Sequence, residues 1–161
     1  IEGWATSVDV LLSSFFENGG KHPEYEGRKI YFDTSKIRKK GAFISGGFKA
    51  PGPEPLISAL NKIEQLINEL ISKGVDKLSP INVYDIGMFI ADAVLSGGVR
   101  RSATIFLFSV DDEEMLHAKT GNWFEENPQR ARSNNSAVIL RSAAKKDDFI
   151  KIIESIKKLI A

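Results

Sequence analysis

Apolar residues recur at helical spacing in four parts of the chain. The spacing predicts helices over residues 3–17, 55–73, 83–95 and 148–161, because side chains three or four positions apart lie on one helix face. Residues 111–119 are expected to form a shorter helix. Asn18-Gly19-Gly20 and Gly74 are typical helix ends, and Asn82 is the expected cap of the third helix, with Asp85 in its first turn. The last helix should bury Phe149, Ile152, Ile153, Ile156 and Leu159.

Three short runs rich in strand-forming residues lie between these helices. They are RKIYF at 28–32, ATIFLF at 103–108 and AVIL at 137–140. ATIFLF hardly alternates, which is typical of a central strand covered on both faces. Helices that alternate with uniformly apolar strands predict an α/β fold with mainly parallel pairing.

Composition restricts the function classes. The 161 residues carry a net charge of +1, so any anion site must be local, and neither a nucleic acid nor a membrane is an expected partner. The absence of cysteine excludes disulfides, thiolate metal sites and thiol chemistry by this chain alone. His22 and His117 lack metal-site spacing, no apolar run is long enough to cross a membrane, and the start does not have the pattern of a signal peptide. We expect a cytoplasmic location.

A long segment, residues 35–55, has no helical period and holds five basic residues, four glycines and three prolines. Long irregular loops in compact chains are often functional. Lys36, Arg38, Lys39 and Lys40 precede Gly46-Gly47, yet the order matches neither a Walker loop nor a dinucleotide fingerprint. Phosphate binding here would use arginine forks, lysine charge and backbone N–H groups, whereas the alternative is a solvated basic turn.

A second glycine-rich loop, LSGGVRRSATI at 95–105, joins a predicted helix to the predicted central strand. Loops in this position commonly build sites in α/β sheets, and two basic loops could converge on one polyanion. In the simpler interpretation Gly97 and Gly98 only end the helix, and Arg100 and Arg101 point into water.

Further polar residues are weaker candidates. Ser133-Asn134-Asn135-Ser136 precede a predicted buried strand, from which they could contact a ligand's hydroxyl groups, although an asparagine turn would explain them as well. Asp111, Asp112, Glu113 and Glu114 favour a helix start, and Glu125 and Glu126 are expected in a solvated loop.

Taken together and in order, these segments resemble ribonucleotide reductase, most closely its adenosylcobalamin-dependent type. The matching segments are FDTSKIRKKGAFISGGFKAPGPEPL, VYDIGMFIADAVLSGGVRRSATIFLF and DEEMLHAKTGNWFEENPQRARSNNSAVI, and EGWATSVDVLL fits the preceding helix. The resemblance implies that residues 1–161 are one segment of a ten-stranded α/β barrel. Effector-specificity helices and loops would lie in 1–101, and barrel strands and helices in 102–161.

The resemblance also assigns roles to residues. The first specificity loop would bind a deoxynucleoside triphosphate effector through Lys36, Arg38, Lys40, Ser45, Gly46, Gly47 and Lys49. Many relatives have a basic residue where this chain has Ser45, so that contact is missing or supplied by Lys49. The second loop would comprise Ser96, Gly97, Gly98, Arg100, Arg101 and Ser102, with Arg100 reaching toward the substrate base, and Asn134 and Asn135 would lie near the ribonucleotide substrate.

The resemblance further implies adenosylcobalamin as cofactor, a homodimer formed through helices 4–17 and 83–95, and association with the remainder of the reductase. The family's radical and redox cysteines are absent here, so the isolated chain should be inactive. The alternative is a stand-alone deoxynucleotide-binding regulatory module without catalysis. Whether diphosphates or triphosphates are reduced stays open, and an RNA-binding role is disfavoured because the aromatic residues form no stacking platform.

Overall fold

A computed structural model describes residues 2–95 and 103–160 of the chain, which divide into two units. The first unit comprises residues 2–76, and the second comprises residues 77–95 and 103–160. The helix at 80–95 belongs to the second unit, because it packs against the short helices at 113–116 and 128–132. No helix in the described ranges is long and apolar enough to cross a membrane.

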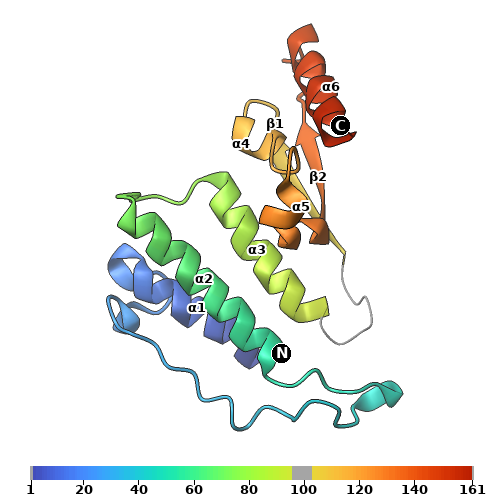
Figure 1. The fold of residues 1–161 in the computed structure, drawn as a ribbon. Helices are drawn as coiled ribbons and strands as arrows, with labels where there is room; N and C mark the ends of the chain where they lie inside the picture. The colour runs from blue at the N-terminus through green and yellow to red at the C-terminus, as the bar shows by residue number, and fades with distance from the viewer. Residues whose placement is uncertain (1, 96–102, 161) are drawn as a thin grey trace. The chain divides into compact units, whose positions relative to one another are not determined.

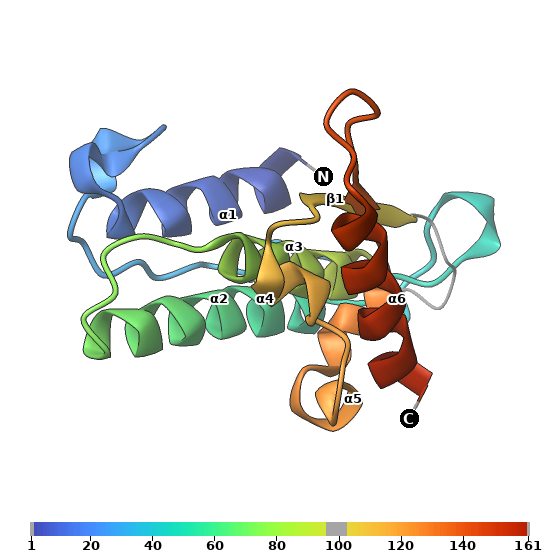
Figure 2. The same cartoon turned by 90° about the horizontal axis from the view of Figure 1, so that it is seen from above.

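The first unit is built on two helices in contact, α1 (Glu2–Phe15) and α2 (Glu54–Ser72), which run side by side in Figures 1 and 2. α1 ends at Phe15, shortly before the predicted stop at Asn18 and Gly19, whose φ angles of 63° and 60° are left-handed. Two 3-10 turns, η1 (Glu17–Gly19) and η2 (Pro23–Tyr25), follow it. α2 has Pro55 in its first turn and ends before Gly74, as predicted. Its buried residues are Leu56, Ala59, Leu60, Ile63 and Ile67.

A long connection joins α1 to α2. The strand predicted at 28–32 is not present: the segment forms no ladder with any described residue. Residues rich in β-propensity adopt a strand only when a neighbouring strand supplies backbone partners, and the described part of this unit offers none. Beyond it, the segment 35–53 is irregular, as predicted, apart from the 3-10 turn η3 (Ser45–Gly47).

The second unit contains a parallel pair of strands, β1 (Thr104–Ser109) and β2 (Ser133–Val138), visible in Figure 1. The register runs from Thr104 opposite Ser133 to Ser109 opposite Val138. The chain segment that connects β1 to β2 contains α4 (Glu113–Leu116), α5 (Trp123–Glu126) and the 3-10 helix η4 (Pro128–Arg132). α3 (Pro80–Leu95) precedes the pair, and α6 (Lys146–Ile160) follows it.

One face of the strand pair carries the core of this unit. Tyr84 and Met88 of α3 cluster there with Met115 of α4 and Ala118, and Phe106 and Phe108 of β1 pack against them. Because side chains alternate along a strand, Ile105 and Leu107 point to the other face, where they are 63% and 64% exposed. The expectation that β1 is covered on both faces is therefore wrong for the described chain.

Three further expectations about this unit need correction. β2 begins at Ser133 rather than Ala137, so Ser133–Ser136 belong to the strand and not to a turn. The side chains of Ser133 and Asn135 form hydrogen bonds with Tyr84 and with each other, which offsets the cost of placing polar residues on the covered face of a strand. Glu125 and Glu126 are exposed, but they lie in α5 rather than in a loop.

Helix ends and faces also differ from expectation. α3 starts at Pro80, and the Asn82 amide oxygen accepts hydrogen bonds from the backbone N–H and hydroxyl of Ser79, so Asn82 lies inside the helix rather than capping it. On α6, Phe149, Ile153 and Ile156 are about half exposed, because no described element covers them. At α4 the predicted structural role of the acidic cluster is confirmed for Asp112, whose carboxylate accepts from the Met115 N–H.

Candidate functional site

Residues 34–53 form the cationic loop of the first unit, and backbone hydrogen bonds close its second half. Gly41 N–H donates to Ala50 O at 2.9 Å, Ala50 N–H to Ala42 O at 2.7 Å and Ile44 N–H to Phe48 O at 2.8 Å. These bonds form a small hairpin over residues 41–50, with Phe43 opposite Lys49 in an isolated bridge. In Figure 2 the loop projects beyond the ends of α1 and α2.

The tip of this hairpin consists of three of the predicted effector-binding residues, Ser45, Gly46 and Gly47. The two glycines have φ angles of 81° and 76°, which other residues rarely adopt. Gly52 (φ 85°) closes the loop at its other end, where a Cβ atom would lie 3.2 Å from the backbone nitrogen of Lys40. The loop conformation thus depends on glycine both at the tip and beside Lys40.

The four predicted cationic ligands, Lys36, Arg38, Lys40 and Lys49, all belong to this loop and are exposed. Among the described residues, none of them forms an ion pair. Residues 34–53 contain no acidic side chain at all. The loop is therefore a local concentration of uncompensated positive charge on a chain that is nearly neutral, which is what a polyanion site requires.

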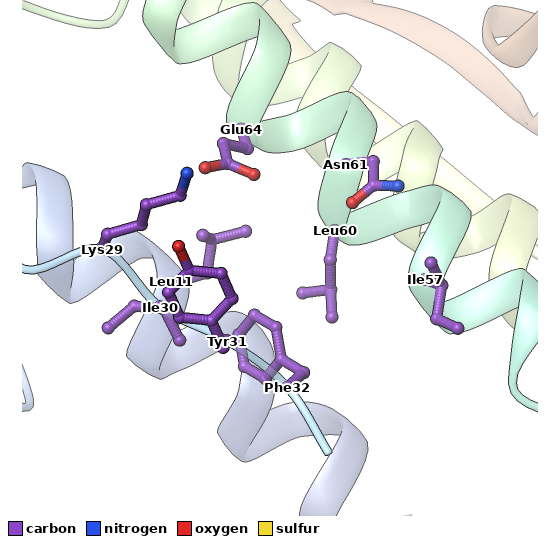
Figure 3. Close-up of a pocket in the computed structure, with 9 residues that line it drawn as sticks. All are labelled: Leu11, Lys29, Ile30, Tyr31, Phe32, Ile57, Leu60, Asn61 and Glu64. Carbon is purple, nitrogen blue, oxygen red and sulfur yellow. The ribbon is translucent and has the colours of Figure 1, made fainter. Parts of the chain in front are cut away.

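A groove of about 310 Å³ lies beside the start of this loop, between α1, α2 and the extended segment 29–32 (Figure 3). Its apolar wall is formed by Leu11, Leu60 and Ile57, while the Lys29 ammonium points toward the Glu64 carboxylate at its rim. Lys29 Nζ also lies 5.4 Å from the centre of the Tyr31 ring. Sequence reasoning did not single out this groove, because its residues come from three separate segments.

The second unit contains a buried polar network that sequence reasoning also missed. Tyr84, which is fully buried, places its hydroxyl 2.9 Å from Ser133 Oγ, 3.1 Å from Asn135 Oδ1 and 3.2 Å from Arg130 O. Burial raises the pKa of the Tyr84 phenol, and its hydrogen bonds to Ser133 and Asn135 partly oppose that rise. The phenol is therefore neutral at physiological pH and joins α3 to β2.

Beside Tyr84, Asp85 and Arg130 form a two-pronged ion pair. Arg130 Nε donates to Asp85 Oδ1 at 2.8 Å, and Arg130 Nη2 donates to Oδ2 at 2.6 Å. Gln129 Nε2 donates to the same carboxylate at 3.1 Å, and Arg130 Nη1 to Ala118 O at 2.9 Å. Asp85 was expected to favour the helix dipole in the first turn of α3, but it is buried one turn further on and pairs across the unit.

One sequence signal could have revealed this pair. An acidic residue between Tyr84 and Ile86, on a largely apolar helix, needs a partner when it is buried. The partner's position 45 residues later could not be read from the pattern. Seven residues after Asp85, Asp92 pairs with Arg132 at 2.5 Å, so α3 holds the segment before β2 at two points.

The two asparagines predicted near substrate lie on opposite faces of β2. Asn135 faces the core, where it contacts Tyr84, and Asn134 is exposed on the open face opposite Ile105. A cavity of about 300 Å³ borders β2 between α4 and α6, with Lys119 at its edge. Lys119 Nζ donates to Ser133 O at 2.5 Å and lies 5.7 Å from the Trp123 ring, and burial lowers its pKa. The predicted second-loop residues Ser96, Gly97, Gly98, Arg100, Arg101 and Ser102 lie outside the described residues.

Comparison with known proteins shows which enzymes this chain resembles in sequence. It is 35% identical over 160 residues to a probable adenosylcobalamin-dependent ribonucleoside-triphosphate reductase of Dictyostelium discoideum, a match that covers 96% of the chain and 19% of that protein. It is 35% identical over 139 residues to the adenosylcobalamin-dependent ribonucleoside-triphosphate reductase of Lacticaseibacillus paracasei (86% and 18%), and 34% identical over 143 residues to that of Lactobacillus leichmannii (88% and 18%). The chain is homologous to one segment of these reductases.

The resemblance inferred from the ordered motifs is thus confirmed. The chain spans about a fifth of the length of these curated relatives. The reductases are named for their dependence on adenosylcobalamin, which agrees with the predicted cofactor. No family model and no solved structure matches the chain.

Proposed function

We propose that the polypeptide carrying this chain is an adenosylcobalamin-dependent ribonucleoside-triphosphate reductase. The observation that supports this is the similarity, at about 35% identity over nearly the whole chain, to enzymes of that name. In this reaction the ribose C2′–O bond breaks, the hydroxyl leaves as water and a C2′–H bond forms. Two thiols supply the electrons and become a disulfide. Because the 161 residues contain no cysteine, the thiols lie elsewhere, and the isolated chain is inactive.

Within that enzyme, β1 and β2 are two strands of the ten-stranded barrel. Support comes from their parallel pairing and from α3 and α4, which cover a single face. In an α/β barrel the helices lie outside, so the uncovered face turns inward. This face carries Ile105, Leu107, Asn134 and Ser136. The extended segment 28–34, whose sequence favours a strand, would find its partner in the same barrel.

The cationic loop binds the triphosphate of a deoxynucleoside triphosphate effector. Lys36, Arg38, Lys40 and Lys49 supply the charge, and the backbone N–H groups of Gly46 and Gly47 supply further donors. Support comes from the exposure of the four cations and from the absence of ion pairs to them within the described ranges. Ser45 offers a hydroxyl at the same tip.

The roles of the second loop and of the dimer stay proposals that the resemblance alone supports. The second loop, 96–102, passes the identity of the effector base to the substrate, with Arg100 toward the substrate base. A homodimer forms through helices 4–17 and 83–95, which correspond to α1 and α3. Light scattering on the purified polypeptide, with and without effector, measures this association directly.

Adenosylcobalamin would generate the radical that starts the reaction, and we do not assign its site to either of the two cavities described above. The two cavities, of about 310 and 300 Å³, are much smaller than a corrin with its axial ligands. Neither cavity is lined by a histidine.

Calorimetry with deoxynucleoside triphosphates tests the effector site. Arg38→Ala should weaken binding by about 1.5–3 kcal/mol, the range for a hydrogen bond to a charged group. Lys73→Ala is the matched control, because Lys73 is an exposed cation of the same unit outside the loop. Equal losses for the two variants would contradict the assignment.

Turnover tests the reaction itself. The full-length polypeptide, supplied with ribonucleoside triphosphate, adenosylcobalamin and a dithiol, should form deoxyribonucleotide, and residues 1–161 alone should not. Effector binding by a full-length polypeptide that shows no turnover would instead favour the stand-alone regulatory module.

A further inference from the structure

The network between α3 and β2 fixes which face each polar side chain of the strand occupies. Tyr84 Oη lies within hydrogen-bonding distance of both Ser133 Oγ and Asn135 Oδ1, and the Ser133 hydroxyl donates to Asn135 Oδ1 at 2.9 Å. A phenol held in a buried position thus retains Ser133 and Asn135 on the covered face. Since strand side chains alternate, Asn134 and Ser136 must face the other way.

The two ion pairs hold the chain just before this strand. Asp85 and Arg130 are nearly buried, with side-chain exposures of 9% and 13%, and their pairing is two-pronged. Asp92 and Arg132 form the second contact from the same helix. A slip of β2 by one residue would exchange the faces of Asn134 and Asn135, and it would break both ion pairs and the Tyr84 contacts at once.

We infer that Asn134 is the substrate-contacting asparagine and that Tyr84 is the positioning residue, which holds the Asn134 amide on the open face of β2. This inference rests on the proposed function. The ligand chemistry follows from the amide, which both donates and accepts hydrogen bonds and so suits a ribose hydroxyl of the ribonucleotide. Asn135 is excluded from that role, because its amide oxygen is already engaged by Tyr84 and Ser133.

Because Asn134 and Asn135 lie on opposite faces of β2, the same substitution can be made on each face of the strand. Asn134→Asp removes the amide donor and adds a negative charge facing an anionic substrate. We expect it to raise KM for the ribonucleoside triphosphate about tenfold or more in the full-length enzyme. Asn135→Asp keeps the oxygen that accepts from Tyr84, so KM should stay within about twofold of the wild type. Circular dichroism and thermal unfolding of both variants show whether they fold.

Tyr84→Phe tests the positioning role in combination with Asn134→Ala. If Tyr84 acts through Asn134, Tyr84→Phe raises KM on its own but adds little in the double variant. A merely structural role would lower the active fraction, and so kcat, while leaving KM unchanged. Calorimetric titration of the catalytically silent complex, without cofactor or dithiol, gives the substrate Kd for the same four proteins.

The outcomes distinguish a failure of the proposed function from a failure of the assignment of Asn134. Absence of cofactor-dependent turnover by the wild-type enzyme would contradict the proposed function. Turnover by the wild type, with KM unchanged in Asn134→Asp or raised equally in Asn135→Asp, would overturn the assignment of Asn134 and leave the proposed function intact. Additive effects of Tyr84→Phe and Asn134→Ala would overturn the positioning role.

Discussion

Replacing Asp85 by alanine tests how strongly the buried ion pair stabilises the second unit. The Asp85 carboxylate accepts two hydrogen bonds from Arg130 and one from Gln129. Without it, the guanidinium keeps only its bond to Ala118 O among the contacts seen and stays almost buried. Leaving one member of a buried pair uncompensated costs about 3–5 kcal/mol, so Asp85→Ala should lower the free energy of unfolding by that amount.

Asp92→Ala provides the matched control on the same helix. The Asp92–Arg132 pair has exposures of 28% and 48%, so it is screened by water, and its loss should cost only about 0.2–1 kcal/mol. Raising the salt concentration should reduce the effect of Asp92→Ala and leave that of Asp85→Ala nearly unchanged.

Urea unfolding monitored by tryptophan fluorescence measures these differences. The chain has two tryptophans, Trp4 in α1 and Trp123 in α5. In a Trp4→Phe background the signal reports the second unit alone, which matters because two units need not unfold in one transition. The reasoning would be refuted if Asp85→Ala cost no more than Asp92→Ala, or if Asp85→Leu/Arg130→Met, which removes both charges, were less stable than Asp85→Ala.

Three further substitutions test the buried Tyr84 phenol, the glycine beside Lys40 and the open face of β1. The pKa of Tyr84 is raised above its ordinary value of about 10, so the stability that the neutral phenol contributes is complete below pH 10 and is lost as pH rises through the folded-state pKa. Tyr84→Phe should therefore lower the unfolding free energy by about 0.5–1.5 kcal/mol at pH 7. In denaturant titrations above pH 10 the difference between this variant and the wild type should shrink. Gly52→Ala places a methyl group against the Glu54 carboxylate and the Lys40 backbone, and it should reduce effector binding in calorimetry. Gly74→Ala is the control, because Gly74 has a similar φ but open space around it; this change should cost only the backbone strain of about 1–2 kcal/mol in stability and leave binding unaltered. Leu107→Thr should lower the free energy of unfolding of the 161-residue chain by about 0.5 kcal/mol or less, because Leu107 is 64% exposed there. In the full-length polypeptide the same change should cost about 2 kcal/mol or more if the open face lines a barrel. Equal costs in chemical unfolding of the two proteins would count against the barrel.

Local patterns predicted the helices well. α1, α2 and α6 lie within a few residues of their predicted positions, because the apolar period and the glycine ends are properties of the segment itself. The cationic loop was also predicted, since charge, glycine and proline content can be counted directly. Its hairpin bonds and the position of Gly52 beside Lys40 could not be read from the pattern.

The strands were predicted less well, because a strand depends on what lies next to it. RKIYF has strand propensity but no partner among the described residues, and it forms no strand. SNNS has low propensity, yet it starts β2, because β1 supplies the ladder and Tyr84 supplies hydrogen bonds for Ser133 and Asn135.

The sequence by itself determined which segments are helical, where positive charge is concentrated and, through four ordered motifs, the kinship with the reductases. Those features depend on residues close together along the chain. Tertiary structure alone decided that Asp85 pairs with Arg130 and that Asn134 and Asn135 face opposite ways. The physical reason is that a buried charge or amide takes its partner from whatever backbone packing brings near it, here from residues 45 to 51 positions away.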